Sequence, residues 1–187
     1  MSSTVHYPIP DHIHEYVKKQ GYAWPYDDMA SFIEIWHSFF MADGEFWDWQ
    51  ERVNGVLLKV HRMSIHPAER VCNEWASLLL NEETVINTED DGCNQWIEEF
   101  LDSIDFEMRG QESLMRAFAL GTGAWDLSID TGHGTLQMET YDARSIVPLS
   151  WDNSGITEIA LCTKVNYQGK MYDQLKMHVM DGGRYHI

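Results

Sequence analysis

The spacing of apolar residues changes once along this chain, and that change limits the folds open to it. Up to about residue 121, apolar residues recur at intervals of three and four, the period of a helix with one buried face. From residue 122 to residue 187 they alternate with polar residues, which is the period of a strand. The sequence therefore predicts an α+β fold in which a helical N-terminal half packs on a C-terminal antiparallel β-meander.

This pattern divides the chain into three regions. Residues 1–20 form an arm, marked by Pro8 and Pro10, followed by a short helix. Residues 21–121 are mainly helical and include a small hairpin, and residues 122–187 form the antiparallel β region. A chain of this length can enclose one good core, or one domain with a small satellite, and we predict that the three regions together form one domain.

The mainly helical region opens with a helix and a hairpin. Either Asp27 or Asp28 can cap a helix that ends at Gly44. Five apolar residues share one face of that helix: Met29, Phe32, Ile33, Trp36 and Phe40. Asn54-Gly55, between Val53 and Val56, is a strong signal for a hairpin turn.

Three more helices are expected before residue 122. Pro67 suits the first position of a helix with an apolar face that includes Trp75, and we expect Trp75 to be buried. The other members of that face are Val71, Leu78 and Leu79. Thr84–Asn87 is predicted to be a short strand, and the acidic segment "TEDDGC" can cap the next helix. The last helix, about Gln111–Leu120, ends at Gly121–Gly123.

In the β region, turn residues separate the predicted strands. Trp125, Leu127 and Ile129 alternate with polar residues, so we expect one buried face and one solvated face. The expected turns are residues 132–134, 152–155, 167–170 and 181–184, each containing glycine.

The charge of the chain argues against nucleic-acid binding. The chain has 13 basic and 30 acidic residues and a formal net charge of -17. Such a surface repels phosphate, and Lys18-Lys19 is the only adjacent basic pair. We attribute the acidity mainly to solubility.

Cysteine usage and the N-terminal residues indicate the compartment. Cys72, Cys93 and Cys162 are far apart and form no CxxC pair, which favours free thiols in a reducing environment. The first residues lack the basic and apolar segments of a secretory signal. No apolar run approaches the ~20 residues of a membrane-spanning helix, so no membrane partner is expected.

Asp130-Thr131-Gly132 has the form of an aspartic-protease active-site loop. Such a site needs two aspartates that share a proton, and the chain has no second Asp-Thr/Ser-Gly. His133 also stands where those proteases usually have a small residue. Because aspartate and glycine are turn-forming residues, we interpret Asp130 as a strand-end residue of a hairpin.

The histidines give no specific metal-site signal. His12 and His14 are two residues apart on a predicted helix and point to different sides. His61 and His66 have no cysteine partner at ligand spacing.

Two further motifs are open to a functional and a structural explanation. Gly121–Gly123 resembles a phosphate cradle but follows a helix and precedes a strand, the reverse of the usual order. Trp47-Asp48-Trp49 could stack on a sugar or a base, although the eight tryptophans are spread along the chain as core residues are. The residues alone therefore assign no catalytic, cofactor-binding or metal-ligating residue.

Glu69–Ile86, "ERVCNEWASLLLNEETVI", resembles the helix-then-strand segment of phage portal proteins. The matching positions are Val71, Cys72, Glu74, Trp75, Ala76, Leu78, Leu79, Asn81 and Glu82. Further segments are similar to that family's early helices and its sheet, in the same order along the chain: Ile13–Tyr22, Ile33–Trp49, Ala117–Asp130, Tyr141–Leu161 and Tyr172–Ile187. One departure is His37-Ser38-Phe39-Phe40 with a later Gly44, where the family has "W-Y-x-G".

The resemblance implies a structural virion protein and no enzyme. Portal proteins, also called head-tail connectors or minor capsid proteins, form a dodecameric ring at one capsid vertex. Double-stranded DNA is packaged and ejected through that ring without specific binding. The expected partners are further copies of the chain, the major capsid protein, the terminase, and head-completion and tail adaptor proteins. The expected location is the virion, with assembly in the host cytoplasm.

Portal proteins are much longer than 187 residues, so the matched part corresponds to their N-terminal, wing-type portion. An acidic surface suits a channel through which DNA must slide, because basic contacts would hold the phosphates. A reading from another class stays open. It is a small hydrolase or ligand-binding module that uses the Asp130-Thr131-Gly132 loop or the Trp-rich surface.

Overall fold

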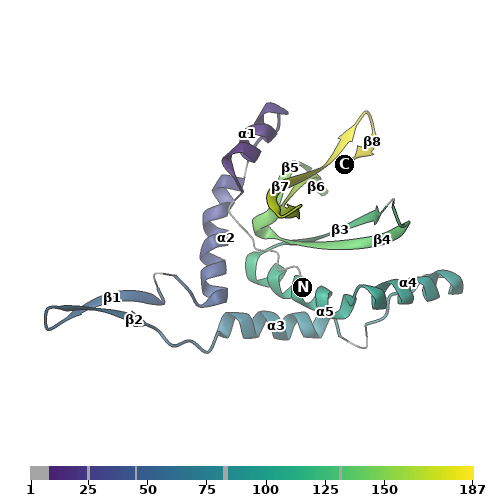
Figure 1. Cartoon of the computed structure of the whole chain (residues 1–187). Coiled ribbons are helices and arrows are strands. Elements are labelled where there is room, and N and C mark those ends of the chain that lie inside the picture. The colour runs from purple at the N-terminus through teal and green to yellow at the C-terminus, as the bar shows by residue number, and fades with distance from the viewer. Residues whose placement is uncertain (1–8, 25, 45, 82–83, 131) are drawn as a thin grey trace. The chain divides into compact units, whose positions relative to one another are not determined.

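The computed structural model of the chain describes residues 9–24, 26–44, 46–81, 84–130 and 132–187 (Figure 1). The expected arm up to Pro8, Glu82 of the matched segment and Thr131 of the candidate loop lie outside the described residues.

The α+β class is confirmed, with helices first and an antiparallel meander last. The described helices are α1 (Asp11–Lys19), α2 (Tyr26–Met41), α3 (Pro67–Leu79), α4 (Asp91–Ser103) and α5 (Phe106–Leu120), with a short 3-10 helix η1 (Ala143–Ser145). The strands are β1 (Asp48–Val53), β2 (Val56–His61), β3 (Gly123–Asp130), β4 (Thr135–Asp142), β5 (Ile146–Asp152), β6 (Gly155–Tyr167), β7 (Lys170–Asp181) and β8 (Arg184–His186).

The chain divides into two compact units. One contains Met1–Ile33 and Tyr141–Ile187, and the other contains Glu34–Thr140. These boundaries differ from the three sequence-based regions, because the first helix groups with the last strands. The change of hydrophobic period at residue 122 reports local structure, whereas the units depend on contacts between distant segments.

The first unit is built on a four-stranded antiparallel sheet in the order β5-β6-β7-β8. Its core is the segment from Tyr141 to Leu149, which enters the sheet, together with Ala160–Cys162 on β6. Helix α1 contributes Ile13 and Val17 to the buried residues. His12 Nε2 lies 3.3 Å from Asp173 Oδ2 of β7, which ties α1 to the sheet.

A buried ion pair joins the end of β4 to η1 in this unit. Arg144 Nη2 lies 3.0 Å from Asp142 Oδ2, with the two side chains 12% and 2% exposed. Asp142 also accepts a hydrogen bond from the Arg144 backbone N–H at the start of η1. Nearby, burial and the charge of Asp173 raise the pKa of the Cys162 thiol to about 12.

The second unit is built on the pairing of α3 with α5. A Cβ at Gly110 would overlap the Leu80 side chain, so glycine allows the end of α3 to approach α5 closely. Gln111 Nε2 donates a hydrogen bond of 2.8 Å to the Leu80 carbonyl oxygen at this point. Strand β3 follows α5 directly, because Gly121 at φ +91° ends the helix as expected.

Three local expectations before residue 122 are wrong. Helix α2 begins at Tyr26, before either predicted cap, and α5 begins at Phe106, several residues earlier than expected. Thr84–Asn87 is irregular and not a strand. At its start, the Thr84 backbone N–H donates to the Asn81 carbonyl at 2.9 Å, and the Thr84 hydroxyl accepts from the Asn81 N–H at 3.0 Å.

The β3–β4 hairpin reverses the expected burial of β3. Asp126 is buried, whereas Leu127 and Ile129 are 57% and 67% exposed. The apolar face of this strand is therefore uncovered in the second unit, although the alternation itself is as predicted.

Candidate assembly surface

The β1–β2 hairpin is the most exposed pair of strands in the second unit. Asn54 and Gly55, at φ +52° and +84°, form the predicted tight turn, and Val53 pairs with Val56 across it. The register places one apolar set on a single face: Trp49, Val53, Val56, Leu58 and Val60. Most of these side chains are exposed, so this face has no cover within the described residues.

An aromatic cluster holds the base of the hairpin to the end of α2. The Phe46 and Trp47 rings meet edge to face at 5.0 Å, and Trp47 also meets Phe39 at 6.5 Å. The Arg62 guanidinium lies 4.7 Å from the ring centres of both Phe46 and Trp49. Trp47 and Trp49 therefore pack at the hairpin base, where both are half-buried, and do not form an open stacking platform.

The apolar face of α3 is exposed, and the expectation that Trp75 is buried is wrong. Trp75 is 54% exposed and touches Phe118 with a ring separation of 6.3 Å. Helix α3 packs on α5 through Ala76, the one buried residue of its length, and turns Trp75 partly away. Helical spacing fixed which residues share a face but not whether a neighbour covers that face.

Two shallow apolar grooves run along this exposed face. One has a volume of about 400 Å³ and includes Ile65, Trp75 and Leu78. The other, of about 460 Å³, includes Trp36, Phe40 and Phe118. Val71 lines both grooves, so they form a continuous apolar strip beside α3.

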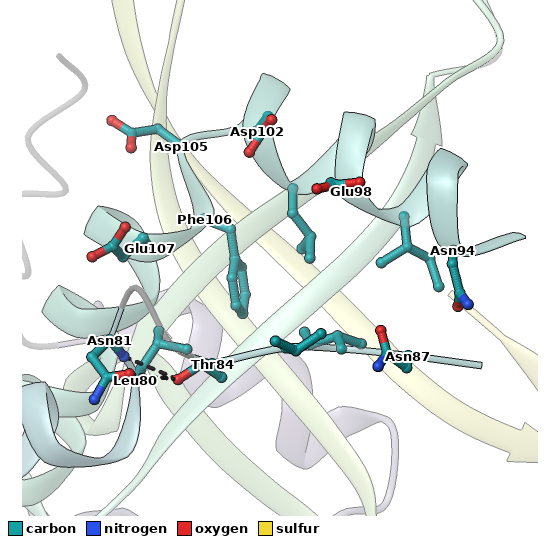
Figure 2. A pocket seen from close by; sticks show the side chains of 14 residues that line it. Leu80, Asn81, Thr84, Asn87, Asn94, Glu98, Asp102, Asp105, Phe106 and Glu107 are labelled. Carbon is teal, nitrogen blue, oxygen red and sulfur yellow. Dashed lines mark hydrogen bonds between the residues drawn. The ribbon is translucent and has the colours of Figure 1, made fainter. Parts of the chain in front are cut away.

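A third cavity, of about 520 Å³, lies between α4, the first residues of α5 and the segment after α3. Its apolar lining is Leu80, Val85, Ile86, Ile97, Leu101 and Phe106. Four carboxylates, Glu98, Asp102, Asp105 and Glu107, stand around it. Figure 2 shows the Phe106 ring projecting between the carboxylates of α4 and the segment 84–87.

The sequence pattern does not predict this cavity. Its acidic residues belong to two helices joined by a sharp turn at Asp105, which has a positive φ of 53°. The only signal was the acidic run "DSIDFE" between two apolar faces, which is also what two solvated helix ends look like.

The loop beginning at Asp130 closes a turn. Asp130 Oδ1 accepts a hydrogen bond from the Gly132 N–H at 2.8 Å, and Oδ2 lies 2.8 Å from His133 Nδ1. These bonds lower the pKa of the Asp130 carboxyl, the His133 bond most strongly. Asp130 is the last residue of β3, and both of its carboxylate oxygens bond within the turn that follows. No hydrogen bond joins it to a second aspartate of the described residues.

The histidines singled out in the sequence take local partners. His61 Nδ1 lies 2.8 Å from Asp48 Oδ1, His66 lies 3.4 Å from Glu69, and the His14 ring stacks on Trp24 at 4.6 Å. Across the described ranges, no group of three histidine, cysteine or acidic side chains is arranged to hold a metal ion.

Comparison of the chain with protein-family models, with curated proteins and with solved structures finds no match. Among the described helices, none is both long and apolar enough to cross a membrane.

Proposed function

We propose that this chain is a structural assembly protein of the phage-portal class, corresponding to the N-terminal, wing-type portion of the ring subunit. In this role it contributes to a ring of identical subunits at the capsid vertex and contacts capsid, terminase and tail-adaptor proteins. Double-stranded DNA passes through the ring without specific binding, and the chain performs no reaction itself.

The distribution of apolar residues in the second unit carries this proposal. The apolar side chains buried among its described residues are only Ala42, Ala76, Leu80, Leu120 and Met138. Far more large apolar side chains are exposed there, on α3, on the β1–β2 hairpin and on β3. Exposed apolar surface on this scale marks interaction sites, so the unit suits a protein whose core is completed by assembly.

The ordered resemblance to portal segments gives the assembly its class. The segments that resemble portal proteins correspond to α3, to the turn from α5 into β3, and to the meander that starts at Tyr141. The acidic net charge supports the same role, because phosphate contacts are few where carboxylates dominate.

The alternative of a small hydrolase or ligand-binding module has weaker support. Asp130 is engaged in its own turn, and Trp47 and Trp49 pack at the hairpin base. The cavity between α4 and α5 contains no histidine, cysteine or lysine among its lining residues.

Negative-stain microscopy of the protein that carries this chain, expressed in its full reading frame, tests the proposal. The expected result is a ring with twelvefold rotational symmetry in class averages. A uniform population of single-copy particles at all protein concentrations would contradict the proposal.

A further inference from the structure

The β1–β2 hairpin and the α4–α5 cavity have complementary chemistry. The hairpin tip, residues 52–59, combines Arg52 and Lys59 with exposed apolar side chains. It contains no carboxylate. The exposed apolar members are Val53, Val56, Leu57 and Leu58. In a chain of net charge -17, this tip is a local positive and apolar surface.

The hairpin needs a partner to be rigid. An isolated two-stranded hairpin is marginally stable in water, and three strands or a packed face are needed for independent stability. Only the base of the hairpin is packed, through Trp49 and Arg62. The tip beyond Glu51 has exposed side chains on both strands.

The α4–α5 cavity has the apolar and acidic side chains that would complement the hairpin tip. Its six apolar side chains form a lining, and its volume of about 520 Å³ is within the ~300–1,000 Å³ of typical binding pockets. Glu98 and Asp102 on α4 and Asp105 and Glu107 at the start of α5 provide carboxylates for two cations. The two grooves beside α3 carry only Glu74 among acidic residues, so the cavity is the better match for Arg52 and Lys59.

The two surfaces lie apart within one copy of the second unit. The hairpin and α4 are at opposite ends of α3, which itself has 13 residues and a length of ~20 Å (Figure 1). A contact between them therefore joins two copies, with different surfaces on each side. Contacts of this head-to-tail type close into rings or extend as filaments.

We propose that the tip of the β1–β2 hairpin of one copy inserts into the α4–α5 cavity of a second copy. Val53, Val56 and Leu58 on one face of the hairpin cover the apolar lining, and Arg52 and Lys59 on the other face pair with the surrounding carboxylates. This inference deepens the proposed assembly function and rests on it, since it names one contact through which copies associate.

Complementary charge reversals test this contact in the 187-residue chain. The tip variant carries Arg52→Glu with Lys59→Glu, and the cavity variant carries Glu98→Lys with Asp102→Lys. Lys18→Glu with Lys19→Glu on α1 is a matched control, because it changes the net charge by the same amount as the tip variant. All the substituted residues are exposed, so circular dichroism should show unchanged folding.

Sedimentation velocity at low salt measures the outcome, because charged contacts are weakly screened there, with a Debye length of ~30 Å at 0.01 M. We expect the wild type and the α1 control to self-associate, and each contact variant to do so at least about tenfold more weakly. Mixing the two variants should restore pairs, because the cavity variant keeps a native tip and the tip variant keeps a native cavity.

The two proposals fail in different ways. Self-association of the tip variant at wild-type strength overturns the hairpin contact and leaves the assembly proposal standing. A wild-type chain that stays monomeric at every concentration also overturns the contact as an interface of this chain. A contact that forms normally while the full reading frame yields no ring overturns the portal assignment alone.

Discussion

Trp125 Nε1 donates a hydrogen bond of 2.8 Å to Ser113 Oγ, which joins β3 to α5 within the second unit. Ser113 is buried on α5, and the Trp125 ring also meets Phe106 edge to face at 5.3 Å. One indole thus links three points of the unit: the start of α5, its middle and the first strand after it. Phe106 also lines the α4–α5 cavity, so this contact helps to set the position of the cavity wall.

Trp125→Phe should lower the free energy of unfolding by about 1 kcal/mol, because it leaves the Ser113 hydroxyl without this donor. Ser113→Ala should have a smaller effect, since the indole N–H of a partly exposed tryptophan can bond to water. Urea denaturation monitored by circular dichroism measures both. An equal or larger loss in Ser113→Ala would contradict the assigned roles.

Asp142→Ala should destabilise the first unit by about 3 kcal/mol or more, because the Arg144 guanidinium would stay buried without its carboxylate. The double substitution Asp142→Ala with Arg144→Met should recover part of that loss, since no charge is then buried. Thermal unfolding of the single and double variants checks this order. A double variant less stable than Asp142→Ala would show that Arg144 is stabilised by other groups.

The Asp130 carboxyl should titrate below its ordinary pKa, because the His133 side chain and the Gly132 N–H bond to its ionised form. A depressed pKa in the folded state gives a stabilisation that is present above the unfolded pKa and is lost as pH falls through the folded pKa. His133→Ala should therefore raise the Asp130 pKa, measured by carboxyl carbon NMR. An unchanged titration would show that the turn does not hold the carboxylate.

We expect the chain to have no peptidase activity, so Asp130→Asn should leave a peptidase assay unchanged. A pepstatin-sensitive activity that is lost in this variant would support the protease interpretation.

Trp75→Ala should cost about 1–2 kcal/mol of stability, less than truncation of a fully buried aromatic, because about half of the side chain is exposed. The variant should fold, and its loss should appear in association. Melting temperature and sedimentation velocity of the same preparation separate the two effects. An insoluble variant would restore the sequence-based expectation that Trp75 is a core residue.

The chain should not bind duplex DNA tightly. With 13 basic against 30 acidic residues, fluorescence anisotropy at about 150 mM salt should show no saturation at concentrations where non-specific binders respond, ~10⁻⁴ to 10⁻⁶ M. Saturable low-micromolar binding that weakens steeply with salt would make this chain a DNA-gripping element.

The elements that could be predicted from sequence are those fixed by local chemistry. Asn54-Gly55 predicted the hairpin turn, Pro67 predicted the start of α3, and Gly121 predicted the end of α5. Each of these residues favours the backbone conformation found at its own position. The meander was predictable for the same reason, since its turns contain glycine and its strands alternate.

The sequence does not show whether each apolar face is covered by another segment or exposed. Val71, Trp75 and Leu78 share a face of α3, and Leu127 and Ile129 share a face of β3, as predicted. Both faces are exposed. Whether a face is covered depends on segments distant in the chain, which a local pattern of residues does not report. The prediction of a strand at Thr84–Asn87 was wrong for a further reason, because the Thr84 hydroxyl bonds to the Asn81 backbone N–H and so competes with strand pairing.

Native mass spectrometry of the protein carrying this chain in its full reading frame tests the central claim most directly. If head-to-tail contacts between copies cover the exposed apolar surface, the spectrum should show one closed assembly of twelve copies. That assembly should be lost when Arg52→Glu and Lys59→Glu are introduced and kept when Lys18→Glu and Lys19→Glu are introduced. A single-copy mass under conditions that preserve known assemblies would contradict the account.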